Sequence, residues 1–161
     1  MTFMDIIGIM QKMETLNTQR INGSLQAVCL CGKGVLMGIR YRHGIALVKD
    51  VAASKHFYAD IIGLAIEKDF DSMVLFKGDF AIHSAEIFYG YLNKPYHGEK
   101  MGHDNVDFYF TTDNLEEFQQ KLKDEKVSFI HEIRLHDWGE RVIRVYDPDG
   151  HIVEIGDADG E

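Results

Sequence analysis

The sequence has few cysteines, few prolines and no long apolar run, and each shortage excludes a class of protein. The two cysteines, Cys29 and Cys31, are too few for a disulfide framework and are typical of a reducing compartment such as the cytoplasm. Two prolines and fifteen glycines exclude collagen-like and low-complexity chains. No apolar run approaches the roughly 20 residues that a membrane helix needs, and the N-terminus has no basic region or cleavage site typical of a secretory signal.

Basic residues are also in short supply. Seventeen Lys and Arg stand against 26 Asp and Glu, which gives a formal net charge of −9. Such a field repels nucleic acid and anionic membrane surfaces, so we expect neither as a partner. The 161 residues, 45% of them hydrophobic, are enough for one globular domain with a sizeable core, since a chain near this length buries roughly 70% of its unfolded surface.

The first 36 residues differ from the rest of the chain. Apolar residues between Phe3 and Leu16 recur at helical spacing, which predicts a short amphipathic helix. Regular strand alternation begins only near Tyr41. Residues 1–36 are therefore either an arm that packs on the domain or on a partner, or an extension upstream of a natural start at Met37. In both cases the domain proper covers residues 37–161.

Two blocks of elements with the same order follow. The first predicts a strand at 43–49, a helix over 51–62 between the caps Asp50 and Gly63, and strands at about 65–70, 73–77 and 80–85. Residues 86–104 are predicted to be a linker or flexible lid. The second predicts a strand at 106–112, the cap Asp113, a helix over 115–123, and strands at about 128–135, 141–146 and 151–155. This internal repeat, with modules at about 41–85 and 105–156, gives each half one helix for one face of its sheet.

Several segments of the two blocks resemble one known family. They are His43-Gly-Ile-Ala-Leu-Val-Lys-Asp50, Ser54-Lys-His-Phe-Tyr58, Ile62-Gly-Leu64 and Tyr146-Asp-Pro-Asp-Gly-His-Ile-Val-Glu154. These resemble the glyoxalase/bleomycin-resistance/dioxygenase superfamily, also called vicinal oxygen chelate, over residues 37–161. The resemblance implies an α+β fold in which two βαβββ modules form a cupped, incomplete eight-stranded barrel. It also implies a homodimer that takes a small-molecule substrate or ligand.

The resemblance further implies a divalent metal held by the first and last strands of each module. The matching positions are His43, His83, Asp107 and Glu154, and the repeat makes His43 equivalent to Asp107 and His83 to Glu154. Two imidazoles and two carboxylates suit zinc, nickel, cobalt, manganese or iron. Metal-dependent members commonly have His at the position of Asp107. Either a second carboxylate completes the site here, or the metal is held loosely, or none binds.

Three other histidines lie near these positions in the sequence. His103 could replace Asp107 as a ligand if its loop folds inward. His131 and His136 are expected at the surface or behind the ligands.

The function implied by a filled site is that of a lyase or isomerase acting by proton transfer on a metal-chelated, oxygenated substrate. Glu154 or Asp107, displaced from the metal, would be the base. The glyoxalase branch carries Arg and Asn where this chain has Leu47 and Ile87, which argues against glutathione as a substrate. The alternative is a metal-free binding protein of the bleomycin-resistance type.

The last hairpin adds two candidate substrate-binding residues. If Tyr146 pairs with His151 across the Asp-Pro-Asp-Gly turn, alternation places Arg141 on the same face as Glu154. Arg141 could then bind a substrate anion, and Trp138 could form an aromatic wall. The alternative is an exposed arginine on a strand and a tryptophan packed in the core.

Overall fold

The structure is a computed structural model that describes residues 18–21, 24–27 and 39–158. It consists of two compact units, residues 1–40 and 41–161. In the first unit β1 (Thr18–Ile21) pairs antiparallel with β2 (Ser24–Ala27), in a region where the sequence pattern predicted no strands. The helix predicted between Phe3 and Leu16, both cysteines and the start at Met37 lie outside the described residues. No helix in the described part of the chain is long and apolar enough to cross a membrane.

The first module follows the predicted order. It contains β3 (Gly44–Val48), α2 (Val51–His56), the π-helical segment η1 (Phe57–Ile62), β4 (Ile66–Asp69), β5 (Met73–Phe76) and β6 (Phe80–Ser84). The side chain of Asp50 accepts the Ala53 N–H at 3.0 Å, and Gly63 ends the helical stretch with a left-handed φ of 96°. Both predicted caps are confirmed.

The second module repeats this order with one change at its helix. It contains β7 (Asp107–Thr112), α4 (Leu115–Asp124), β8 (Ser128–Leu135), β9 (Arg141–Tyr146) and β10 (Ile152–Asp157). The prediction of Asp113 as the cap was wrong by one residue. The N-cap is Asn114, which directly precedes the first helical residue, Leu115. Its backbone is extended, and its side chain accepts a hydrogen bond from the Glu117 N–H at 3.1 Å.

The segment between the modules, expected to be a linker or flexible lid, contains a helix that the sequence pattern did not predict. It begins with a helix, α3 (Ala85–Tyr91), whose N-terminus is capped by Ser84. The remainder is anchored to the second module, since the N–H groups of Met101 and Gly102 donate to the Asp149 side chain and carbonyl. A Cβ on Gly102 would lie 1.9 Å from the carbonyl carbon of Gly150, so this approach requires glycine. Gly102, one of the glycines that suggested flexibility, allows close backbone packing instead.

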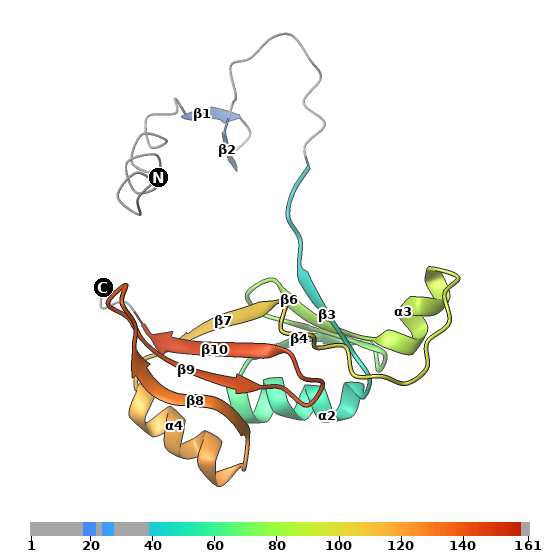
Figure 1. Ribbon diagram of the computed structural model, residues 1–161. Helices are drawn as coiled ribbons and strands as arrows, with labels where there is room; N and C mark the ends of the chain where they lie inside the picture. The colour runs from blue at the N-terminus through green and yellow to red at the C-terminus, as the bar shows by residue number, and fades with distance from the viewer. Residues whose placement is uncertain (1–17, 22–23, 28–38, 159–161) are drawn as a thin grey trace. The chain divides into compact units, whose positions relative to one another are not determined.

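Each module forms its own four-stranded sheet, in the orders β3-β6-β5-β4 and β7-β10-β9-β8 (Figure 1). In both sheets the first strand of the module runs parallel to the last one and beside it, and the other pairs are antiparallel. The shared topology confirms the predicted internal repeat and the α+β class. The two sheets do not close into a barrel.

One face of each sheet packs against helices and forms a common core. Alternate residues along the strands, such as Val48, Phe76 and Ile143, are fully buried in it. Phe80 joins the modules, with its ring centroid 5.0 Å from that of Phe108. Figure 1 shows α2 and α4 below the strands and α3 near the end of the first sheet. The opposite face of the second sheet carries Asp107, Tyr109, Arg144 and Glu154, and we call it the polar face.

Candidate functional site

The β9–β10 hairpin determines which side chains share a face with Glu154. The Asp147 N–H donates to the His151 carbonyl at 3.0 Å, and Tyr146 pairs with Ile152. The loop therefore has three residues and ends in Gly150, whose φ is 91°. The prediction that Tyr146 pairs with His151 was wrong by one residue, because the left-handed glycine completes a three-residue loop.

The corrected register moves Arg141 away from Glu154. Arg141 lies on the α4 side of β9, where its Nε donates to Asp157 at 2.8 Å and its Nη1 donates to Glu116 at 2.5 Å. These two carboxylates raise the pKa of the Arg141 guanidinium. The structure therefore does not bring Arg141 to the predicted site.

Arg144 takes the place beside Glu154 instead. Across the sheet, His131 pairs with Arg144, Arg144 with Glu154, and Glu154 with Tyr109. Directly opposed residues of neighbouring strands point to the same side, so these four form one row on the polar face. A register shift in β8 between Phe129 and His131 brings His131 into the row. Simple alternation would have placed His131 with Phe129 on the core side.

The Arg144 guanidinium contacts three ionisable side chains. Its Nη2 forms an ion pair with Oε2 of Glu154, which is only 8% exposed, and its Nε lies 4.0 Å from Oδ2 of Asp107. Its Nη1 donates to Nε2 of His131 at 3.4 Å. Nδ1 of His131 lies 2.8 Å from the Glu132 carbonyl and must carry the hydrogen, so Nε2 is the acceptor. Sequence reasoning missed Arg144 because the hairpin register was assigned one residue out.

These charges shift the pKa of the Asp107 carboxyl. Burial raises it, the neighbouring Glu154 carboxylate raises it further, and Arg144 opposes both effects. Asp107 and Glu154 thus share one face, with a fixed cation next to both. This arrangement can bind polar groups and can hold a proton on a carboxyl at the surface.

An aromatic stack extends the row beyond His131. The His136 ring lies 5.5 Å from that of His131, and the Trp138 ring stacks on His136 at 4.1 Å. Burial and the Arg144 charge lower the pKa of His136. Trp138 is 50% exposed, so the alternative of a tryptophan packed in the core was wrong. Its exposed ring is available to a ligand at the edge of the polar face.

The two predicted ligands of the first module are far from each other. His83 is buried beside the rings of Phe88 and Tyr91 and pairs with Leu47 across the parallel strands. His43 lies four residues before Leu47, which at about 3.3 Å per residue separates the two histidines by roughly 13 Å along the strand.

The predicted equivalence of the two modules fails at this level. Asp107 lies two residues before Tyr109, which pairs with Glu154, whereas His43 lies four residues before the partner of His83. The register between the first and last strands therefore differs by two residues between the two modules. His103, the other candidate ligand, is exposed in the segment before β7.

The residues of one chain do not fit a divalent metal. Within residues 39–158, no three His, Cys, Asp or Glu side chains are placed to hold a metal ion together. Asp107 and Glu154 do share a face, but the cationic guanidinium of Arg144 lies beside both carboxylates.

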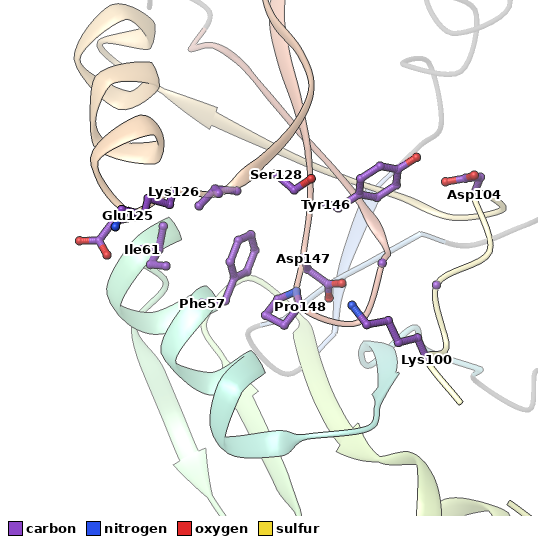
Figure 2. A pocket seen from close by; sticks show the side chains of 13 residues that line it. Phe57, Ile61, Lys100, Asp104, Glu125, Lys126, Ser128, Tyr146, Asp147 and Pro148 are labelled. Carbon is purple, nitrogen blue, oxygen red and sulfur yellow. The ribbon is translucent and has the colours of Figure 1, made fainter. Parts of the chain in front are cut away.

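A separate pocket of about 560 Å³ lies at the end of the second sheet, beside the β9–β10 loop. Figure 2 shows the Tyr146 ring directed toward Asp104 at one side of this pocket, and Lys100 below Asp147. A hydrogen bond to Asp104 and burial raise the pKa of Tyr146. Asp147 itself is buried and accepts the Tyr58 hydroxyl at 2.9 Å, so it stabilises the loop rather than facing a ligand.

Comparison with known proteins agrees with this architecture. Residues 41–158 match the glyoxalase-like domain family. A protein of unknown function from Agrobacterium tumefaciens is 36% identical, with a TM-score of 0.71 over 77% of this chain and 98% of that one. A glyoxalase-related enzyme from Fulvimarina pelagi is 16% identical, with a TM-score of 0.61 over 76% and 89% of the two chains.

A lactoylglutathione lyase from Agrobacterium tumefaciens shares the fold at 17% identity, with a TM-score of 0.54 over 78% of this chain and 96% of that one. None of the curated proteins matches the sequence. The family match covers most of the chain and confirms the resemblance found in the sequence. The protein belongs to the glyoxalase-like domain family.

Proposed function

We propose that this protein binds a small oxygenated molecule on its polar face without a metal ion, as a binding protein of the bleomycin-resistance type. The observation that carries the proposal is the position of Arg144, whose guanidinium contacts Glu154, Asp107 and His131 at the place predicted for the metal. A permanently charged group there supplies the positive charge that a metal would otherwise supply.

The polar face offers complementary contacts to such a molecule. Arg144 donates hydrogen bonds, Glu154 and Asp107 accept them, and the exposed Trp138 ring can cover a flat part of the ligand. Small-molecule sites commonly combine a few placed polar groups with aromatic walls.

The test is a ligand screen on chelator-treated protein, using small carboxylic acids, diols and oxygenated aromatic compounds. Any compound that binds should do so equally well with and without chelator. Arg144→Ala should weaken its binding by at least about tenfold, the loss expected for one hydrogen bond to a charged group. The control Arg141→Ala, on the other side of β9, should leave binding unchanged. Binding that needs an added divalent metal would refute the proposal.

A second candidate is the metal-dependent lyase or isomerase suggested by the sequence. The raised pKa of Asp107 beside Glu154 favours it, because such a carboxyl can hold a proton for transfer. In this case a homodimer, also expected from the family, would have to supply a further ligand, such as the imidazole of His43, from the partner subunit. Metal analysis combined with the oligomeric state tests this candidate. A dimer with one divalent ion per chain, lost on His43→Ala, would favour the enzyme.

A further inference from the structure

We infer that an apolar cleft between the two modules is a second binding site, which takes a small aromatic acid and pairs its anionic group with Lys77. The inference goes beyond the proposed function, because the cleft shares only Tyr109 with the row of polar side chains around Arg144. A ligand in the cleft would therefore be held by other residues than a ligand on the polar face.

Both modules contribute to this cleft. Its volume is about 490 Å³, within the roughly 300–1,000 Å³ of small-molecule pockets. The first module borders it with the end of η1 and the turn between β5 and β6, and the second with β7, α4 and β10. Six apolar side chains line it, and they are Ile62, Leu64, Phe80, Phe110, Phe118 and Ile155.

The cleft runs along one edge of β7. Four consecutive residues of this strand, 109–112, line it, although neighbouring side chains of a strand point to opposite faces. A cavity that reaches all four must therefore lie at the edge of the strand, and β10 occupies the other edge. No second strand pairs with β7 in the part of the chain that the structure describes. Such an edge presents backbone hydrogen-bonding groups to a ligand.

Part of the apolar lining is in contact with water. Ile62, Leu64, Phe110 and Phe118 pack on the core but are only partly buried. A ligand that covers them removes apolar surface from water, which is the dominant favourable contribution to most association. The rings of Phe80 and Phe110 meet edge to face, with centroids 5.9 Å apart and planes at 85°. Aromatic rings favour this geometry, so an aromatic ligand suits the cleft.

Lys77 determines the charge that the cleft prefers. It is the one charged side chain among the described residues that line the cleft, and it is exposed with no carboxylate partner in that part of the chain. The pocket beside the β9–β10 loop differs, because Asp104, Glu125 and Asp147 line it together with two lysines. An unpaired cation beside apolar walls favours an anion with an apolar body.

The experiment is a fluorescence titration of the full-length protein with anilinonaphthalene sulfonate, an aromatic anion, followed by displacement with naphthoate or with its neutral amide. We expect one probe molecule per chain. Naphthoate should displace it at a concentration at least about threefold lower than the amide, the preference expected from one exposed ion pair. Lys77→Gln should weaken probe binding by a similar factor and abolish the preference for the acid.

Two further variants separate the charge from the apolar walls. Lys68→Gln is the matched control and should bind like wild type, because Lys68 is exposed on β4 of the same sheet and does not line the cleft. Leu64→Trp should abolish probe binding, because the larger ring fills the cleft. Circular dichroism establishes that each variant is folded, and Ile62→Trp replaces Leu64→Trp if that variant is not.

Three results would overturn the inference. One is a folded wild type that does not bind the probe, or that Lys77→Gln equals in affinity and in preference for the acid. Another is unchanged binding in a folded Leu64→Trp variant. The third is probe binding that is lost in Arg144→Ala but kept in Lys77→Gln, which would place the probe on the polar face instead of in the cleft.

Discussion

At the scale of single residues, Arg144 and Arg141 show how burial changes the contribution of an ion pair to stability. Both arginines lie on β9, and the guanidinium group of each bridges two carboxylates. The Arg144 side chain is 25% exposed and its partner Glu154 is buried, whereas the Arg141 side chain is 41% exposed between two exposed acids. Removing one partner of a buried pair leaves a charge that water cannot solvate, and exposed pairs carry no such penalty.

The two arginines should therefore differ in their effect on stability. We expect Arg144→Ala to lower the free energy of unfolding by about 1–3 kcal/mol at neutral pH, and Arg141→Ala to lower it by about 0–1 kcal/mol. Urea denaturation of both variants measures this difference. Equal losses would contradict the account of Glu154 as a buried partner.

Asp107 provides a pH-dependent prediction. Burial and the nearby Glu154 raise the pKa of its carboxyl in the folded state, so the stability linked to this group is present at low pH and lost as the pH rises through the folded pKa. Asp107→Asn should therefore be more stable than wild type at pH 7, and this advantage should shrink as the pH falls toward 4. Urea denaturation at both pH values checks the sign, and an Asn variant that is less stable at pH 7 would contradict it.

At the scale of secondary structure, turns and bulges determine the site more than the strands do. The alternation of apolar residues was sufficient to predict β3, the capped helix of the first module and the repeated strand order. It could not predict the two features that position the row. One is the three-residue loop ending in Gly150, and the other is the register shift before His131. Each shifts the strand pairing by one residue and so moves side chains to the opposite face of the sheet.

The helix α3 was missed for a related reason. Ser84 caps it and Glu86 lies in its first turn, but Gly90 and the following glycines suggested a loop. The predicted equivalence of the two modules fails because the repeat was aligned on the helix caps, while the strand ladders differ by two residues between modules. A single sequence carries no direct record of either register.

Two glycines in the segment between the modules have opposite roles. Gly102 has no room for a side chain, since a Cβ would meet the Gly150 backbone, whereas a Cβ on Gly90 in α3 meets nothing within 4 Å. We expect Gly102→Ala to lower the free energy of unfolding by about 1–3 kcal/mol, and Gly90→Ala to raise it by about 0.5–1 kcal/mol. Thermal and urea denaturation of the two variants test this contrast, and a neutral Gly102→Ala would contradict the close packing.

At the scale of the whole unit of residues 41–161, buried polar contacts connect the two modules. Tyr58 of η1 donates its hydroxyl hydrogen to Asp147, and the Lys49 N–H donates to Asp149 at 2.6 Å. Both acids lie at the β9–β10 loop, so the loop that determines the register of the polar face is also the loop that the first module holds. The hydrophobic contact of Phe80 with Phe108 adds to the same interface.

Removing the Tyr58 hydroxyl should weaken this connection. We expect Tyr58→Phe to lower the free energy of unfolding by about 1–2 kcal/mol, because it leaves a buried carboxylate with one donor fewer. Tyr96→Phe is the matched control, since the Tyr96 hydroxyl donates to the Glu99 carbonyl in an exposed hydrogen bond. Similar losses for both variants would show that the buried contact is not special.

The central claim is that a guanidinium, and not a metal ion, supplies the positive charge of the polar face. The most direct measurement is the metal content, by mass spectrometry, of untagged protein purified without chelator and then exposed to zinc, nickel, cobalt, manganese and ferrous ions. The account predicts far less than one divalent ion per chain, with no difference between wild type and Glu154→Gln. About one ion per chain, lost in Glu154→Gln, would contradict it.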